Sequence, residues 1–273
     1  MRTVQAKKIE NAAKELSIQA NLFLRQDILK ALKSAYRAEK NVLAKRMLGM
    51  IIENARIARA RNIALCQDTG MPIVFLEVGQ DVHIAGNLKK AVDKGVEAGY
   101  KKASLRSSIV TSPLHRGTCM YSPVVLHTDI VPGRQVKMTV LPKGFGCENK
   151  TQLKMFKPTA KLSEIKEFII DAVRAAGADA CPPYIISIGI GGTADYAVLL
   201  AKKALLKPLG AKKTALEGDI LKEVNKLKIG PMGMGGNTTT LAVNILSYPT
   251  HIAGLPVAVN INCHALRFAS RKI

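Results

Sequence analysis

The second half of the sequence alternates between helical and strand patterns, and this alternation constrains the fold more than any other feature. In chain order the segments are a helix over 161–177, a strand over 184–192, helices over 193–206 and 215–227, and strands over 240–248 and 257–263. Turns rich in glycine or proline separate several of them. The order predicts helices packed against a sheet, as in an α/β fold.

The first half begins differently. Residues 4–62 are mostly helix formers with apolar positions at helical spacing, which predicts two or three packed helices. A strand over 72–79 and a helix over 87–103 follow, and two β-rich segments meet at Pro132-Gly133, a hairpin turn signal. We predict one mixed α/β (α+β) domain over 1–273, with a helical portion (1–62) packed on the mixed sheets of a second portion (63–273).

Composition excludes several classes of protein. With 48% hydrophobic and 22% charged residues, the chain is globular rather than disordered. It has no apolar run long enough to cross a bilayer and no signal-peptide pattern at its start, so we expect a cytoplasmic protein with reduced thiols. Its five cysteines include no C-x-x-C pair, which argues against a disulfide framework or a zinc ribbon.

The net charge of +21 suggests nucleic acid as one possible partner. However, the chain has no Trp and only 4% aromatic residues, which leaves no obvious platform for base stacking. The basic residues are also spread along helical segments such as 32–47 and 199–213, as on solvated helix faces. An acidic partner chain or an anionic substrate fits this charge at least as well.

Two glycine-rich loops resemble nucleotide-binding motifs. The segment 189–194 matches G-x-G-x-x-G/A, but the strand and acidic residue required about 20 residues later are missing. We expect its glycines to turn the backbone and expose helix N–H groups to an anion. The segment 230–237 has P-loop spacing with Gly236 in place of the lysine, which favours a tight turn before a strand.

The five cysteines all lie in loops or at the ends of regular segments. From these positions alone they are interpreted as buried structural thiols, because free cysteine is among the most buried residue types. Three of them, at 66, 181 and 263, lie at junctions where a side chain can point into a cleft. A metal site would need ligands that converge from distant loops.

Six stretches of the chain change this interpretation. They are LCQDTG from residue 65, LR at 105–106, KGFGCEN from 143, ACPPYIISIGIGGTADYAVLLAKKAL from 180, GPMGMGGNTTTLAVNI from 230 and HIAGLPVAVNINCHALR from 251. In their residues, order and spacing the chain resembles the α-subunit, or N-terminal domain, of the class I iron–sulfur fumarate hydratases and L-tartrate dehydratases. The combination of CQDTG, ACPPY and a cysteine closing the last strand is the most specific part.

The resemblance implies a [4Fe-4S] cluster with one open iron, held by three cysteines. By motif match the ligands are Cys66, Cys181 and Cys263. Cys147 departs from the family, which usually has a small residue such as Ser or Ala there, and Cys119 lies outside the motifs, so both are predicted to be non-ligands. An open iron suits a Lewis acid, whereas four thiolate-bound irons suit electron transfer.

The resemblance also implies residues that contact the substrate. Gln67 and Asp68 are predicted to hydrogen-bond the hydroxyl or water, and Arg106 matches a carboxylate-binding arginine. His251 matches a histidine that contacts the substrate, and we assign catalytic roles to Asp68 and His251. The backbone from Gly144 to Gly146 is predicted to approach the ligand closely.

Three of these residues also have simpler interpretations. Asp68, with Thr69 and Gly70 after it, fits a turn cap. Arg106 considered alone is a solvated surface charge, and His251 a loop histidine bonded to backbone.

The predicted function is therefore that of the α-subunit of a [4Fe-4S]-dependent hydro-lyase, which hydrates fumarate reversibly to (S)-malate in the tricarboxylic acid cycle. The α-subunit motifs do not separate this reaction from the conversion of L-tartrate to oxaloacetate. A basic nucleic-acid-binding or scaffold protein without a cluster is the non-enzyme alternative. The family's second domain supplies further arginines, a lysine and the general base. We expect a separate β-subunit to supply it, in an α2β2 oligomer that binds a dicarboxylate.

Overall fold

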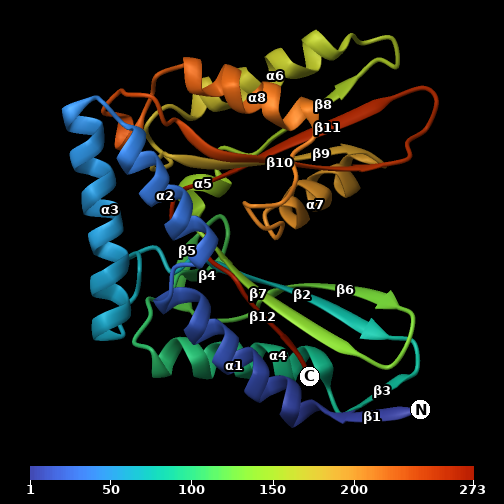
Figure 1. Ribbon diagram of the computed structural model, residues 1–273. Coiled ribbons are helices and arrows are strands. Elements are labelled where there is room, and N and C mark those ends of the chain that lie inside the picture. The colour runs from blue at the N-terminus through green and yellow to red at the C-terminus, as the bar shows by residue number, and fades with distance from the viewer. The chain divides into compact units, whose positions relative to one another are not determined.

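The computed structural model describes all 273 residues, which form two compact units (Figure 1). The first unit comprises Met1–Leu24, Asn54–Phe145 and Arg267–Ile273, and the second comprises Arg25–Glu53 and Gly146–Leu266. Helix α3 (Val42–Arg61) contributes residues to both units. The mixed α/β fold class is confirmed. The function of residues 1–273 as one cluster-binding domain stays a prediction.

The first unit is built on a four-stranded sheet with the order β12-β7-β2-β6. Its strands are β2 (Met71–Gly79), β6 (Val125–Val131), β7 (Val136–Lys143) and β12 (Ala269–Lys272). Strand β2 runs parallel to β6 and antiparallel to β7, which in turn is antiparallel to β12. The last residues of the chain therefore complete a sheet that begins near residue 71.

The predicted hairpin at Pro132-Gly133 is wrong, because β2 lies between β6 and β7. Ile73 pairs with Val125 on one side and with Leu141 on the other. Seven of the nine residues of β2 are buried, whereas no residue of β6 is buried. The most apolar strand thus occupies the interior of the sheet, and the turn connects two strands that flank it.

Two helices of the first unit, α1 (Ala6–Leu22) and α4 (Leu88–Lys102), pack against each other, and α1 also contacts the sheet through β7. Two glycines on α4 allow this close contact. A Cβ at Gly95 would lie 2.3 Å from the carbonyl oxygen of Glu10, and one at Gly99 would lie 2.6 Å from that of Lys14. Two short sheets, β1 (Arg2–Gln5) with β3 (Val82–Ala85) and β4 (Ile109–Ser112) with β5 (Arg116–Met120), complete the unit.

The second unit contains a sheet with the order β10-β9-β11-β8. Its strands are β8 (Gln152–Phe156), β9 (Tyr184–Gly191), β10 (Thr240–Tyr248) and β11 (Leu255–Asn262). The helices are α2 (Gln26–Ala38), the short α5 (Phe145–Glu148), α6 (Leu162–Ala176), α7 (Ala194–Ala204) and α8 (Ala215–Lys226). The first residue of α5, Phe145, belongs to the first unit. Strands β9 and β10 are parallel, while β11 is antiparallel to both of its neighbours.

Helices cover both faces of this second sheet (Figure 1). Helices α6 and α8 lie on one face, where Val257, Val259 and Ile261 of β11 join the main core of the unit. Helix α7 lies on the other face, where Ala197 and Ala201 pack on Ala258. The alternation along β11 thus divides the apolar side chains between two helical layers.

The two glycine-rich loops have structural roles. Gly189 lets α7 approach β9, because a Cβ there would lie 2.0 Å from the carbonyl oxygen of Ala197. Gly191 and Gly192 turn the backbone at φ values of +91° and +70°. The α7 N-terminus already has a carboxylate, since Asp195 accepts a hydrogen bond from the Thr193 hydroxyl that lowers its pKa. The 230–237 loop leads into β10, which confirms the predicted turn before a strand.

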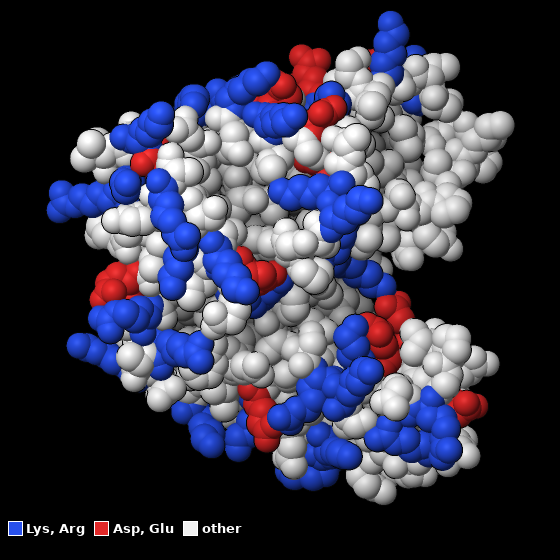
Figure 2. Space-filling model, viewed as in Figure 1, with Lys and Arg blue, Asp and Glu red and all other residues white.

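Lys and Arg side chains are scattered over the visible surface, with fewer Asp and Glu side chains among them (Figure 2). This distribution agrees with the predicted spread of basic residues along solvated helix faces. None of the helices combines the length and apolar character needed to cross a membrane.

The contact between α1 and α4 yields a test of the packing. Gly95→Ala is expected to destabilise the chain by about 1–3 kcal/mol, because the new methyl group must push the α1 backbone away. Gly218→Ala in α8 is the matched control, since a Cβ there meets no atom within 4 Å. This control should stabilise by about 0.4–1 kcal/mol. Urea unfolding of both full-length variants measures the effect, and a Gly95→Ala chain as stable as wild type would refute the packing argument.

Candidate functional site

The CQDTG loop, residues 66–70, leads directly into β2 and is held from several sides. The Tyr100 hydroxyl donates a hydrogen bond of 2.8 Å to the carbonyl oxygen of Thr69. The Thr69 hydroxyl in turn donates one of 2.7 Å to the carbonyl oxygen of Arg106. Gly70, at a φ of +73°, lies so close to β7 that a Cβ would be 2.8 Å from the backbone of Lys143. Helix α4, the segment before β4 and the end of β7 therefore fix one loop.

Asp68 is held in this loop through both its side chain and its backbone. Its Oδ1 accepts a hydrogen bond from the Gly70 amide at 3.0 Å, and its Oδ2 accepts one from the Phe145 amide at 2.9 Å. The Arg267 guanidinium donates to the Asp68 carbonyl oxygen. The turn-cap interpretation is thus confirmed through the bond to Gly70. Each carboxylate oxygen still has a lone pair that can accept a proton from another hydroxyl group.

Gly144 has a specific reason to lack a side chain. A Cβ at this position would lie 3.0 Å from Asp68 Oδ2, a tight contact that would push the carboxylate away by a few tenths of an ångström. At Gly146 the nearest neighbour of a Cβ would be the Asp179 carbonyl oxygen at 3.9 Å, an ordinary contact. Of the two predicted glycines, only Gly144 lies where a side chain would crowd the Asp68 carboxylate.

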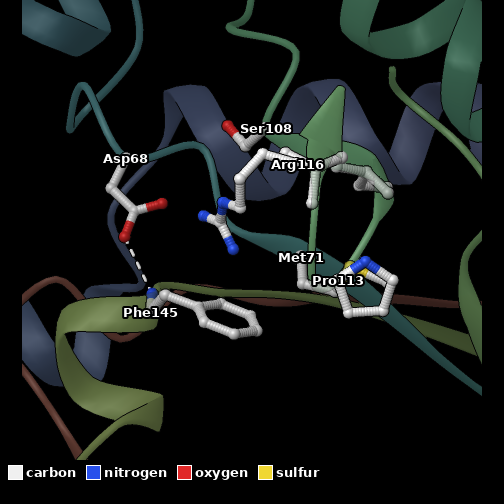
Figure 3. A pocket seen from close by; sticks show the side chains of 8 residues that line it. Asp68, Met71, Ser108, Pro113, Arg116 and Phe145 are labelled. Carbon is white, nitrogen blue, oxygen red and sulfur yellow. Dashed lines mark hydrogen bonds between the residues drawn. The ribbon is translucent and has the colours of Figure 1, made fainter. Parts of the chain in front are cut away.

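The Asp68 carboxylate borders a pocket of about 310 Å³ in the first unit (Figure 3). The pocket is lined by Asp68, Met71, Ser108, Ile109, Val110, Pro113, Arg116 and Phe145. Most of these side chains are apolar, and the polar ones are one carboxylate, one hydroxyl and one guanidinium. Such a combination of apolar walls and a few polar groups is typical of a site for a small polar molecule.

Two other predicted residues of the first unit lie outside this lining. Gln67 and Arg106 are both exposed. The backbone of Arg106 is fixed through its carbonyl oxygen, which accepts hydrogen bonds from Thr69 and Ser108. The structure therefore brings Asp68, Gly144 and the Arg106 backbone together, and it leaves the Gln67 and Arg106 side chains on the surface.

The second unit contains three of the five cysteines, at the end of β11, before β9 and in α5. Cys147 is buried, and its sulfur accepts a hydrogen bond of 3.1 Å from the Cys263 amide. Its thiol also lies 3.6 Å from the Ala180 carbonyl oxygen. His264 Nδ1 is 3.0 Å from the Cys181 carbonyl oxygen, which connects the loops of Cys181 and Cys263.

The predicted iron ligands are distributed over both units. Cys66 belongs to the first unit, whereas Cys181 and Cys263 belong to the second, and all three are partly exposed. No group of three or more His, Cys, Asp or Glu side chains is arranged to hold a metal ion. Of the two predicted non-ligands, Cys147 packs its sulfur in the core against backbone groups, whereas Cys119 is exposed. The assignment of the three ligands stays a prediction.

His251 is exposed and lines a different hollow, of about 410 Å³, in the second unit. Its Nδ1 accepts a hydrogen bond of 3.2 Å from the Ala253 amide, as expected for a loop histidine bonded to backbone. In the neutral ring this bond places the proton on Nε2, which can then donate to an oxygen atom. Asp195, Tyr196 and Tyr248 line the same hollow.

Three further residues around the CQDTG loop were not predicted. Tyr100 holds the loop, Arg267 holds the Asp68 backbone, and Arg116 extends into the pocket beside Asp68. Arg267 lies within the last of the six motif stretches, so its position was a usable signal. Tyr100 is one of several apolar positions of a helix, and Arg116 is one of 41 basic residues, so no local pattern marks either.

Comparisons with known proteins agree with the motif pattern. The family model described as "Fumarate hydratase (Fumerase)" matches residues 10–272. A protein named "Putative L(+)-tartrate dehydratase subunit alpha" from Methanocaldococcus jannaschii is 38% identical, over 97% of this chain and 98% of its own length. An Escherichia coli K12 protein named "L(+)-tartrate dehydratase subunit alpha" is 30% identical, over 88% of this chain and 82% of its own length.

Tyr100→Phe tests how the loop is held. Removing the hydroxyl leaves the Thr69 carbonyl oxygen without its donor, which is expected to cost about 1–3 kcal/mol and to speed hydrogen exchange at the Gly70 and Phe145 amides. Burial raises the pKa of Tyr100 to about 12. The folded chain therefore binds this proton more tightly than the unfolded chain, and the contribution of Tyr100 to stability falls as the pH rises from about 10 to 12.

Urea unfolding at pH 7 and pH 11 measures both effects. Tyr36→Phe is the control, since Tyr36 is partly exposed on α2. Equal stability and equal amide exchange in Tyr100→Phe and wild type would show that the hydroxyl does not hold the loop.

Proposed function

Because the chain belongs to the fumarate hydratase (Fumerase) family, we propose that it is the α-subunit of a hydro-lyase that hydrates fumarate reversibly to (S)-malate. The observation that carries the proposal is Asp68, a motif carboxylate that two backbone amides hold at the edge of a small-molecule pocket. Such a carboxylate can accept the proton of a hydroxyl group or a water molecule, which addition of water across a double bond requires.

We assign Cys66, Cys181 and Cys263 as the ligands of a [4Fe-4S] cluster with one open iron. The motif match supports this assignment, as do the partial exposure of the three thiols and the engagement of Cys147 with backbone groups. When bound, the cluster would supply a Lewis acid for the substrate's oxygen atoms.

The chain's own residues would bind and orient the substrate. Asp68 accepts the hydroxyl proton through a free lone pair, and Gln67 hydrogen-bonds the same oxygen. Arg106 binds a carboxylate as a bidentate fork, and His251 donates its Nε2 proton to a carboxylate or to the leaving oxygen. Gly144 makes room for the Asp68 carboxylate, and the Gly144 to Gly146 backbone approaches the ligand.

A partner subunit is part of the proposal. The relatives are named "subunit alpha", which supports a β-subunit here as well. The β-subunit would supply the general base that abstracts the carbon-bound proton when water is eliminated, together with further carboxylate-binding residues, in an α2β2 oligomer. We place the protein in the cytoplasm, where thiols stay reduced and available to iron.

L-tartrate is the second candidate substrate, and its product would be oxaloacetate. The specific observation in its favour is the name of the relatives, which are called L(+)-tartrate dehydratase subunits. Tartrate differs from malate by one hydroxyl group, and the motifs shared by the two enzymes do not distinguish them.

The test of the proposed function is co-expression with a candidate β-subunit, followed by anaerobic assays on fumarate, (S)-malate and L-tartrate. Asp68→Asn is expected to lower the rate by about 10²–10⁴-fold, because the amide cannot take up a proton in the same way. Asp81→Asn, at an exposed turn of the same unit, should leave the rate unchanged. No turnover of any of the three acids, or an Asp68→Asn variant as active as wild type, would contradict the proposal.

The ligand assignment is tested separately by iron content and visible absorbance after anaerobic reconstitution. Single replacements of Cys66, Cys181 or Cys263 by Ser should abolish both signals. Cys119→Ser, at an exposed position, and Cys147→Ser, whose hydroxyl can still accept from the Cys263 amide, should retain them. Loss of colour in either control would show that the assignment is wrong. A colourless wild-type chain without iron would favour the scaffold or nucleic-acid-binding alternative.

A further inference from the structure

The Arg116 guanidinium extends into the pocket on the side of Asp68 and close to the Phe145 ring (Figure 3). It forms no hydrogen bond and no ion pair with any other residue of the chain. Asp68 forms no ion pair with it, and both carboxylate oxygens accept hydrogen bonds from backbone amides. Five N–H donors and a full positive charge therefore remain available in a pocket with mostly apolar walls.

The backbone around Arg116 has an unusual conformation. Arg116 has a φ of +65° and Gly117 one of +70°, a left-handed region that a residue with a side chain such as arginine rarely adopts. The β4–β5 pairing also has a register irregularity between Val110 and Ser112, directly opposite this point. Bulges of this kind redirect side chains and occur often beside functional sites.

The pocket chemistry selects among small molecules. A guanidinium binds a planar carboxylate through two parallel hydrogen bonds. The Ser108 hydroxyl also lines the pocket, but its proton is donated to the Arg106 carbonyl oxygen, so Arg116 is the donor that the lining offers to an acid. The side chains of Met71, Ile109, Val110 and Phe145 offer contacts for carbon atoms but none for a second charge. A volume of about 310 Å³ is at the lower end of the range for small-molecule pockets. A short organic acid, with a carboxylate at one end, fits these properties.

We propose that this pocket binds one carboxylate of the dicarboxylate substrate, with Arg116 as the carboxylate-binding residue. The inference rests on the proposed function and adds a second arginine to Arg106, so that the first unit of this chain provides one guanidinium for each end of the acid. The carbon chain of the substrate contacts the apolar walls, and its hydroxyl group faces Asp68.

Kinetics of the co-expressed enzyme test the role of Arg116. Arg116→Gln is expected to raise KM for the diacid by about 10- to 100-fold with a smaller change in kcat, since a charged hydrogen-bonded pair is lost. Arg116→Lys should have an intermediate effect, because an ammonium group keeps the charge without the fork. Arg134→Gln, an exposed arginine of the same unit, is the control and should leave KM unchanged.

A half-amide of the substrate, in which one carboxylate is replaced by a neutral amide, gives a sharper readout. Wild type should prefer the diacid, and this preference should shrink in Arg116→Gln but not in Arg134→Gln. If the role of Arg116 is merely structural, its replacement would weaken the binding of the diacid and of the half-amide equally. An unchanged KM and an unchanged preference in an active Arg116→Gln enzyme would overturn the inference while the proposed function stands.

Binding to the full-length chain alone separates the two proposals. Succinate, an unreactive diacid, should shift the amide resonances of Ser108, Ile109 and Phe145 in a saturable way. The shifts should disappear in Arg116→Gln and persist in Arg134→Gln. Absence of saturable shifts in the folded wild-type chain would overturn the inference whatever the enzyme assays show. Saturable binding together with no turnover of any acid would instead count against the proposed function alone.

Discussion

The contact between Gly70 and the end of β7 is the constraint on which the candidate site depends. A side chain at residue 70 would collide with the backbone of Lys143, so the CQDTG loop can lie against β7 only with glycine there. This contact brings Asp68 to the Phe145 amide, and the missing side chain of Gly144 leaves space for the carboxylate. Two glycines from motifs more than 70 residues apart thus position one carboxylate.

Residues around the loop reinforce this arrangement through hydrogen bonds to its backbone. Tyr100 is buried in the α1–α4 layer and donates to Thr69, while Arg267, near the chain's last strand, donates to the Asp68 backbone. Hydrogen bonds to a rigid core orient a functional side chain more accurately than loop contacts alone. The core of the first unit and the candidate chemistry are therefore parts of one network.

The order of strands shows where reasoning from the sequence fails. The signal at Pro132-Gly133 correctly marked a turn, yet the two strands it joins are separated by β2. The residues of a turn carry no information about which strand is most apolar. The burial of β2 decides that β6 and β7 pair with β2 rather than with each other. The glycines of 189–192 are a similar case. Gly189 serves the packing of α7, and Asp195 already supplies a carboxylate at the helix end where an anion was expected.

The sequence by itself determined the family, the mixed α/β class, the positions of most helices and of six of the twelve strands, and Asp68 as a residue to examine. These depend on local periodicity and on motifs that are readable one segment at a time. Only the tertiary structure decided that Gly144 makes room for Asp68, that Tyr100 and Arg267 hold the loop, and that Arg116 shares its pocket. Those relationships join residues that are far apart in the sequence. Their separation along the chain does not tell how close they lie in space, because packing of the core decides that.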